Sequence, residues 1–152
     1  MPAVDVTTQI EIASPRERVA QFAGDPGNAA RWYRNIESVE WLTPGPVDVG
    51  SRIQFVARFL GRTLRYIYEV RELETGMRLV MSTADGPFPM ETTYAWEDVE
   101  GGVTRMVLRN RGEPAGFAKV SAPILARAMR RANEGDLRQL KQIMEAEERV
   151  AD

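Results

Sequence analysis

One segment decides the fold: residues 117–148 read FAKVSAPILARAMRRANEGDLRQLKQIMEAEE. Apolar side chains recur there every three or four positions, which is the spacing of one face of an α-helix, and the opposite face is charged. The apolar stripe consists of Phe117, Val120, Ile124, Leu125, Ala128, Met129, Ala132, Leu137, Leu140, Ile143 and Met144. The sequence therefore predicts one long amphipathic C-terminal helix.

Two residues interrupt this helical pattern. Pro123 lacks a backbone donor, so it either kinks the helix or marks the position where the main helix begins. Gly135 costs about 1 kcal/mol relative to alanine inside a helix. We expect the apolar residues before Gly135 to cover a cavity. Beyond it, we expect Leu137, Leu140 and Met144 to anchor the helix to the core.

The segments before this helix alternate between apolar and polar residues, as strands with one solvated face do. Seven strands are predicted, at residues 4–12, 36–42, 52–60, 63–73, 78–83, 89–99 and 103–111. Several turns between them are short and contain glycine, which is typical of an antiparallel meander. The predicted fold class is α+β, with a curved seven-stranded antiparallel sheet and one long helix across it.

Two short helices are predicted between the first and second strands. Ser14 is expected to cap the first helix, with Pro15 at its first position and Glu17 completing a capping box. Asp25, also followed by proline, repeats this start signal, and the second helix is expected to end near residue 30 or 31. Trp32 comes next, and two roles stay open for it. It either gates the mouth of the cavity together with Tyr33 or anchors the short helix to the sheet.

Composition excludes several kinds of chemistry. The chain has 152 residues and a formal charge of −2, which suits one domain at residues 1–152 and does not suggest a nucleic-acid surface. It has no cysteine and no histidine, so thiolate and imidazole groups are missing as nucleophiles, bases and metal ligands. We expect no cofactor and no metal.

No apolar run approaches the ~20 residues that cross a bilayer, and residues 1–5 lack a signal-peptide pattern. A cytoplasmic monomer or homodimer is expected.

The inward faces of the predicted strands are rich in aromatic and apolar residues. Such residues commonly fill a solid core, which is one interpretation. The other is a ligand cavity of at least about 300 Å³, because a strongly curved sheet has more concave area than one helix can fill. The predicted cavity residues are Trp32, Phe55, Phe59, Tyr66, Tyr68, Met81, Met90, Thr92, Tyr94, Met106, Leu108, Asn110, Phe117, Ile124, Leu125 and Met129.

The order of these elements resembles a known fold family, and five stretches of sequence support the likeness. They are IASPRERV at residues 12–19, DP at 25–26 leading to Trp32, VGSR at 49–52, YAW at 94–96 and DLRQLK at 136–141. Together they resemble the helix-grip fold of the START-like superfamily, and within it the polyketide cyclase/dehydrase branch of the SRPBCC proteins. The resemblance implies a deep cavity that holds lipids, sterols, polyketides, quinones or plant hormones. Some members cyclise or aromatise polyketide chains, whereas many only bind or carry their ligand.

The first functional hypothesis is binding or transport of a hydrophobic small molecule, lipid-, polyketide- or quinone-like, between the sheet and the long helix. The second is a cofactor-independent polyketide cyclase, aromatase or dehydratase. Without histidine or cysteine, its base would be a carboxylate or an activated water, and Tyr or Arg would hold the oxygen. Tyr66, Tyr94 and Arg58 are conceivable oxygen partners. Glu91 or Glu97 would serve as the base only if the phase of their strand were reversed.

A third hypothesis is a protein-interaction module. The charged helix face of Arg127, Arg130 and Arg131 would then dock a partner, although such a run is more often simply solvated.

Overall fold

The computed structural model describes residues 4–86, 88–113 and 121–151. Seven antiparallel strands form one sheet in the order β1-β7-β6-β5-β4-β3-β2, so only β1 pairs with a strand distant in sequence. The strands are β1 (Val4–Ile12), β2 (Ile36–Trp41), β3 (Arg52–Phe59), β4 (Arg62–Glu74), β5 (Arg78–Asp85), β6 (Met90–Val99) and β7 (Val103–Gly112). The helices are α1 (Arg16–Ala23), the 3-10 turn η1 (Pro26–Asn28), α2 (Ala29–Trp32) and α3 (Ala122–Ala151).

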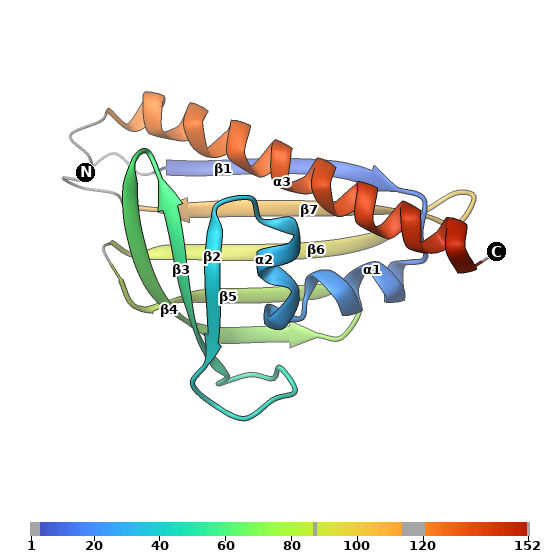
Figure 1. Cartoon of the computed structure of the whole chain (residues 1–152), viewed down its shortest axis with the longest axis horizontal. Coiled ribbons are helices and arrows are strands. Elements are labelled where there is room, and N and C mark those ends of the chain that lie inside the picture. Colours follow the sequence, from blue (N-terminus) through green and yellow to red (C-terminus); the bar gives the residue numbers. More distant parts are fainter. Residues whose placement is uncertain (1–3, 87, 114–120, 152) are drawn as a thin grey trace.

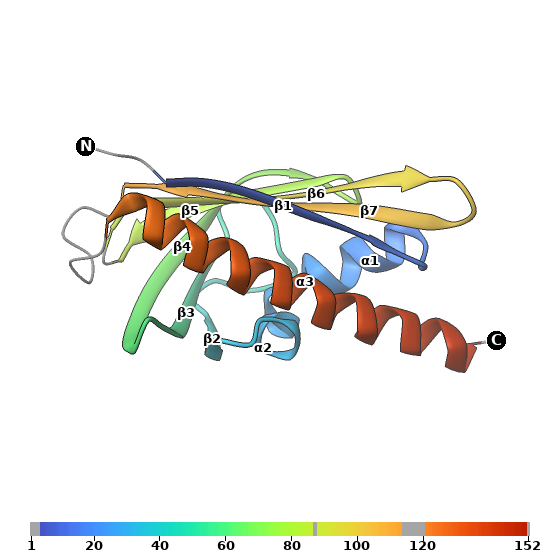
Figure 2. The same ribbon diagram turned by 90° about the horizontal axis from the view of Figure 1, so that it is seen from above.

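The sheet curves around α3. In Figure 1, β2, β3 and β4 run steeply across the direction of β5, β6 and β7, and α3 lies diagonally over the sheet near β1 and β7. Figure 2 shows α1, α2 and α3 on the same side of the sheet, with β2 to β4 bent toward that side. This is the predicted helix-grip architecture. None of the described helices is long and apolar enough to cross a lipid bilayer.

The start of α3 resolves the two roles left open for Pro123. The helix begins at Ala122, and Leu125 N–H donates to the Ser121 carbonyl at 2.9 Å, so Pro123 lies in the first turn. A missing backbone donor costs little there, because the first N–H groups of a helix have no intrahelical partner. The predicted helical residues 117 to 120 lie outside the described residues.

The short helices correct one prediction and confirm another. No side-chain hydrogen bond caps α1, and its N-cap is Pro15, not Ser14. Ser14 is buried, and its hydroxyl donates to Glu148 Oε1 at 3.0 Å, so a contact with α3 replaces the predicted cap. Asp25 does cap η1, because its Oδ1 accepts from Gly27 N–H at 2.9 Å.

Two apolar clusters lie between the sheet and α3. The larger one, here called the packed core, gathers α1, α2 and the second half of α3 against the sheet, and includes Trp32, Trp96, Leu137, Leu140 and Met144. The smaller one, here called the small cluster, consists of Val4, Val6, Leu64, Tyr66, Phe88, Met90 and Leu125. Tyr68 packs against both clusters. The space between them is where the candidate site lies.

Candidate functional site

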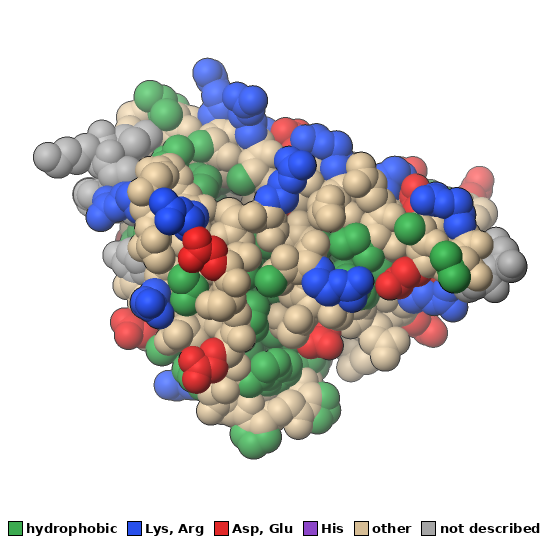
Figure 3. Space-filling view, in the orientation of Figure 1, with side chains coloured by type: hydrophobic (Ala, Val, Ile, Leu, Met, Phe, Trp, Pro, Cys, Tyr) green, Lys and Arg blue, Asp and Glu red, His purple; other side chains and the backbone are tan. Residues whose placement is uncertain are grey.

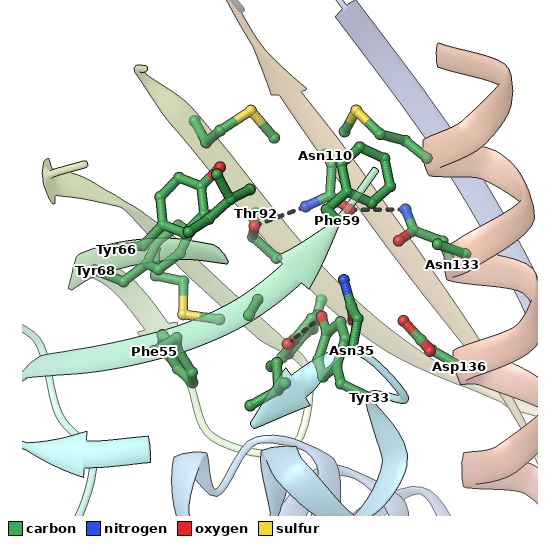
Figure 4. A pocket seen from close by; sticks show the side chains of 18 of the residues that line it. Tyr33, Asn35, Phe55, Phe59, Tyr66, Tyr68, Thr92, Asn110, Asn133 and Asp136 are labelled. Carbon is green, nitrogen blue, oxygen red and sulfur yellow. Dashed lines mark hydrogen bonds between the residues drawn. The ribbon is translucent and has the colours of Figure 1, made fainter. Parts of the chain in front are cut away.

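A cavity of about 140 Å³ lies between the inner face of the sheet and α3. Its wall combines strands β3 to β7, the segment between α2 and β2, and one face of α3, as Figure 4 shows in close-up. The residues that line it are Tyr33, Asn35, Ile36, Phe55, Ala57, Phe59, Leu64, Tyr66, Tyr68, Met81, Phe88, Met90, Thr92, Tyr94, Asn110, Met129, Ala132, Asn133 and Asp136. The space is not packed solid, but it is smaller than the volume of about 300 Å³ expected from the sequence.

Ten of the residues predicted from sequence meet in this wall: Phe55, Phe59, Tyr66, Tyr68, Met81, Met90, Thr92, Tyr94, Asn110 and Met129. Nine of them lie on strands β3 to β7, because residues two apart on a strand face the same side. Met129 comes from α3.

Six predicted residues are not part of the described wall. Trp32, Met106 and Leu108 are fully buried in the packed core, and Leu125 is buried in the small cluster. Ile124 is 61% exposed, so it points away from the sheet. Phe117 lies outside the described residues. The zero exposure of Trp32 favours its role as an anchor, since a gate has to lie at the mouth of the cavity.

Sequence reasoning missed the polar residues that α3 brings to the cavity. Ala132, Asn133 and Asp136 follow Met129 by three, four and seven positions, so all four side chains share one helical face. That spacing is visible in the sequence. The apolar stripe drew attention away from it, because an amide and a carboxylate do not belong to an apolar pattern. Asn35 and Ile36 were also missed, and Tyr33 was predicted only as a partner of Trp32 at the mouth of the cavity. All three residues lie just after the end of α2.

Two hydrogen-bonded groups of polar side chains face the cavity. The hydroxyls of Tyr33 and Tyr94 are 2.6 Å apart, and either one can be the donor. Asn133 Nδ2 donates to Asn110 Oδ1 at 2.8 Å, and Asn110 Nδ2 donates to Thr92 Oγ1 at 2.8 Å. This second chain runs from α3 across β7 to β6 (Figure 4). It satisfies amides that would be costly to bury alone.

The tyrosines at the cavity are protonated phenols. Burial raises the pKa of Tyr68 to about 12, although a hydrogen bond with Thr92 acts in the opposite direction. Burial also raises the pKa of Tyr33, Tyr66 and Tyr94 well above the ordinary value. These hydroxyls therefore act as hydrogen-bond donors or acceptors at neutral pH, and none of them is a phenolate base.

Asp136 is the carboxyl group at the cavity. It is 2% exposed, and its Oδ1 accepts from Arg34 N–H at 3.0 Å, which ties α3 to the residue that follows Tyr33. Burial raises the pKa of Asp136 to about 6, and the hydrogen bond from Arg34 and the charge of Arg34 offset part of that rise. A carboxyl group with a pKa near neutrality is suited to exchanging a proton.

The other acid–base candidates considered from the sequence point away from the cavity. Glu91 pairs with Arg111 and Glu97 pairs with Arg105, at 2.9 and 3.2 Å, on the outer face of the sheet. Arg58 is 3.9 Å from Glu37, and its side chain is 61% exposed. The strand phase predicted from the alternation is therefore correct. These side chains form exposed ion pairs away from the cavity, so they do not reach a molecule bound inside it.

The face of the molecule that carries α3 is mixed in character. Figure 3 shows basic side chains spread along α3, acidic side chains among them, and hydrophobic side chains visible between that helix and strands β2 and β3.

Comparisons with known proteins agree with this fold. A family model described as polyketide cyclase/dehydrase and lipid transport matches residues 3–145. A comparison with curated protein sequences finds no significant match.

Several solved structures superpose on nearly the whole chain. A protein of Thermus thermophilus has a TM-score of 0.79 and 25% identity, covering 93% of this chain and 97% of its own. A START superfamily protein from Mycobacterium smegmatis has a TM-score of 0.81 and 15% identity, covering 93% and 97%. The Zhui aromatase/cyclase from Streptomyces sp. R1128 has a TM-score of 0.77 and 19% identity, covering 98% and 96%. The family match confirms the predicted resemblance to the polyketide cyclase/dehydrase branch, and the superpositions confirm the helix-grip fold.

Proposed function

Because the chain belongs to the polyketide cyclase/dehydrase and lipid transport family, we propose that it binds or carries a hydrophobic small molecule in the cavity beneath α3. One observation carries this proposal. The cavity has a largely apolar and aromatic wall with a few convergent polar groups, which is the usual chemistry of a ligand site.

The small volume of the cavity restricts the size of the ligand that fits without movement of the wall. Ligand sites typically measure about 300–1,000 Å³, so a space of 140 Å³ holds at most a small ring unless the wall moves. The cavity side of α3 offers such movement. Met129 has an unbranched side chain that adapts to irregular space, and it is only partly buried. We expect uptake of a larger ligand to displace Met129 and the first turns of α3.

Native mass spectrometry of the protein purified from its own host tests binding directly. We expect a co-purifying small molecule that is released when the protein is denatured. The variant Ala132→Leu places a larger side chain into the cavity wall and should lower the occupied fraction. Ala146→Leu, the same change at an exposed position of α3, is the matched control and should retain the ligand. Equal ligand retention by both variants would contradict the proposed location.

A second candidate function is cyclisation or dehydration of a poly-keto chain, and Asp136 is the observation that favours it. This buried carboxyl group lies in the same wall as the phenols of Tyr33 and Tyr94, so a proton acceptor and oxygen-binding donors share one cavity. Incubation with poly-β-keto thioesters tests this function. Only spontaneous products, or unchanged turnover by Asp136→Asn, would contradict it.

A further inference from the structure

The cavity contains an unusual set of ionisable groups. All four tyrosines of the chain line it, together with one carboxyl group, Asp136. Among the described residues of the wall, none is lysine or arginine. A molecule in this space would therefore meet phenols, amides, apolar side chains and one acid, and it would meet no cation within the described wall.

Three basic residues near the cavity are not part of its wall. Arg34 is exposed, and its guanidinium lies near Gly135, where a Cβ atom would be 3.5 Å from Nη1. Arg130 Nη1 donates to the Thr7 carbonyl of β1 at 2.9 Å, so this arginine reaches over the sheet edge. The side chain of Arg58 faces solvent beside Glu37. None of these three groups is in the cavity wall to neutralise a bound anion.

The cavity wall already contains one carboxyl group, and the raised pKa of that group shows that the surroundings disfavour negative charge. Burial disfavours the charged form of Asp136 even though Arg34 donates a backbone hydrogen bond to it and the charge of Arg34 also favours the anion. A second carboxylate would face the same loss of hydration and, in addition, repulsion from Asp136.

An uncharged ligand oxygen does not carry this cost and can accept a hydrogen bond in the cavity. The Tyr33–Tyr94 pair has two hydroxyl protons and uses one of them internally, so the other can be donated to a ligand. Donation to a carbonyl or hydroxyl oxygen adds a hydrogen bond without burying a charge.

Building on the proposed function, we infer that the cavity selects uncharged ligands that present a carbonyl or hydroxyl oxygen to the Tyr33–Tyr94 pair, and that it rejects carboxylates of the same shape. The ligand class is a neutral aromatic or alicyclic ketone or alcohol. Free fatty acids and other organic anions are excluded.

Three naphthalene derivatives with a substituent at the same ring position test this selectivity. Acetylnaphthalene carries a ketone, naphthoate replaces its methyl group by a charged oxygen, and ethylnaphthalene lacks oxygen. Their dissociation constants are measured at pH 8 by displacement of a neutral fluorescent naphthalene dye. We expect acetylnaphthalene to bind most tightly and naphthoate to bind at least about 30-fold more weakly.

Two variants separate the contributions of charge and hydrogen bonding. Asp136→Asn keeps an acceptor for Arg34 N–H and should reduce the difference between ketone and carboxylate several-fold. Tyr33→Phe combined with Tyr94→Phe removes both hydroxyls and should weaken acetylnaphthalene by roughly fivefold and leave ethylnaphthalene unchanged. Thermal unfolding of each variant verifies that the fold is intact, and Tyr94→Phe alone replaces the double change if the latter does not fold.

The outcomes distinguish this inference from the proposed function. Binding of all three compounds with naphthoate as tight as the ketone overturns the selectivity and leaves a hydrophobic binder. An equal loss of ketone and hydrocarbon affinity in the tyrosine variant overturns the role of the phenol pair. Absence of binding by all three compounds, and by the dye itself, overturns both proposals.

Discussion

The two halves of α3 perform different tasks. Beyond Gly135, Leu137, Leu140 and Met144 are almost completely buried in the packed core. Before Gly135, Leu125 is buried in the small cluster, but Ile124 is largely exposed, and Met129, Ala132 and Asn133 border a space that is not filled. A helix that is anchored at one end and loosely packed at the other can open at the loose end without unfolding. The apolar stripe is therefore continuous in sequence but serves two purposes.

Polar contacts reinforce the same difference. The second half of α3 is held at four positions: Asp136 accepts from Arg34 N–H, Lys141 Nζ donates to the Glu11 carbonyl, Glu145 accepts from Ala13 N–H, and Glu148 accepts from Ser14 and Arg18. In the described first half, Arg130 makes a comparable contact with β1, and Asn133 makes one with Asn110 of β7.

The largest expected effect comes from the anchored half. Leu140→Ala should lower the free energy of unfolding by about 2–5 kcal/mol, because it leaves a hole in a fully packed core. Met129→Ala removes a side chain that already borders empty space, so it should cost clearly less. Urea unfolding of both variants provides the comparison. An equal cost would mean that the two halves are packed alike.

Asp136 should make stability depend on pH. Its pKa rises from 3.8 to about 6 on folding, so the folded state holds this proton more tightly than the unfolded state. The contribution is therefore most favourable at acidic pH and is lost as pH rises from about 4 to about 6, by at most about 3 kcal/mol. Asp136→Asn should stabilise the protein at pH 7 and have little effect at pH 4.

Urea unfolding at both pH values measures this effect. The exposed Asp85→Asn serves as the control and should show no comparable change with pH. A stabilisation by Asp136→Asn that is equal at pH 4 and pH 7 would contradict burial of a charged carboxylate.

The hydrogen-bonded chain of Asn133, Asn110 and Thr92 joins the loose half of α3 to the sheet. Asn133→Ala removes the donor to Asn110 and should lower the free energy of unfolding by about 1 kcal/mol, since a partly buried acceptor loses its partner. A double-mutant cycle with Asn110→Ala measures the coupling between the two amides, and a coupling near zero would mean that the two side chains do not depend on each other.

The smallest expected effect is at Ile124. Because its side chain is mostly exposed, Ile124→Ala should change the free energy of unfolding by less than about 0.5 kcal/mol and leave ligand affinity unchanged. Thermal unfolding and dye titration check this. A large loss of affinity would show that Ile124 contacts the ligand, as the sequence had predicted.

The sequence predicted the strands well because alternation is a local property. β1 begins and ends where expected, and the inward residues of β3, β4, β6 and β7 follow from the position of the charges. The part of the cavity wall formed by strands could therefore be predicted. The part formed by α3 could not, because a difference of one residue on a helix turns a side chain by about 100°. Leu125 and Ile124, neighbours in the same stripe, end in a core and in solvent.

The roles of two other residues could not be predicted, because they depend on contacts between distant parts of the chain. Ser14 has the sequence context of a helix cap, but its hydroxyl bonds to a residue 134 positions away. Asp136 resembles an ordinary charged helix residue until Arg34 is brought beside it. No local sequence pattern predicts either contact.

Hydrogen exchange along α3, with and without acetylnaphthalene, tests the central claim most directly. If the ligand binds beneath the loose half, amides at residues 125–133 should exchange more slowly in its presence. Amides at residues 137–144 should be slow in both samples. Equal protection along the whole helix, or no change in the loose half at saturating ligand, would contradict the account.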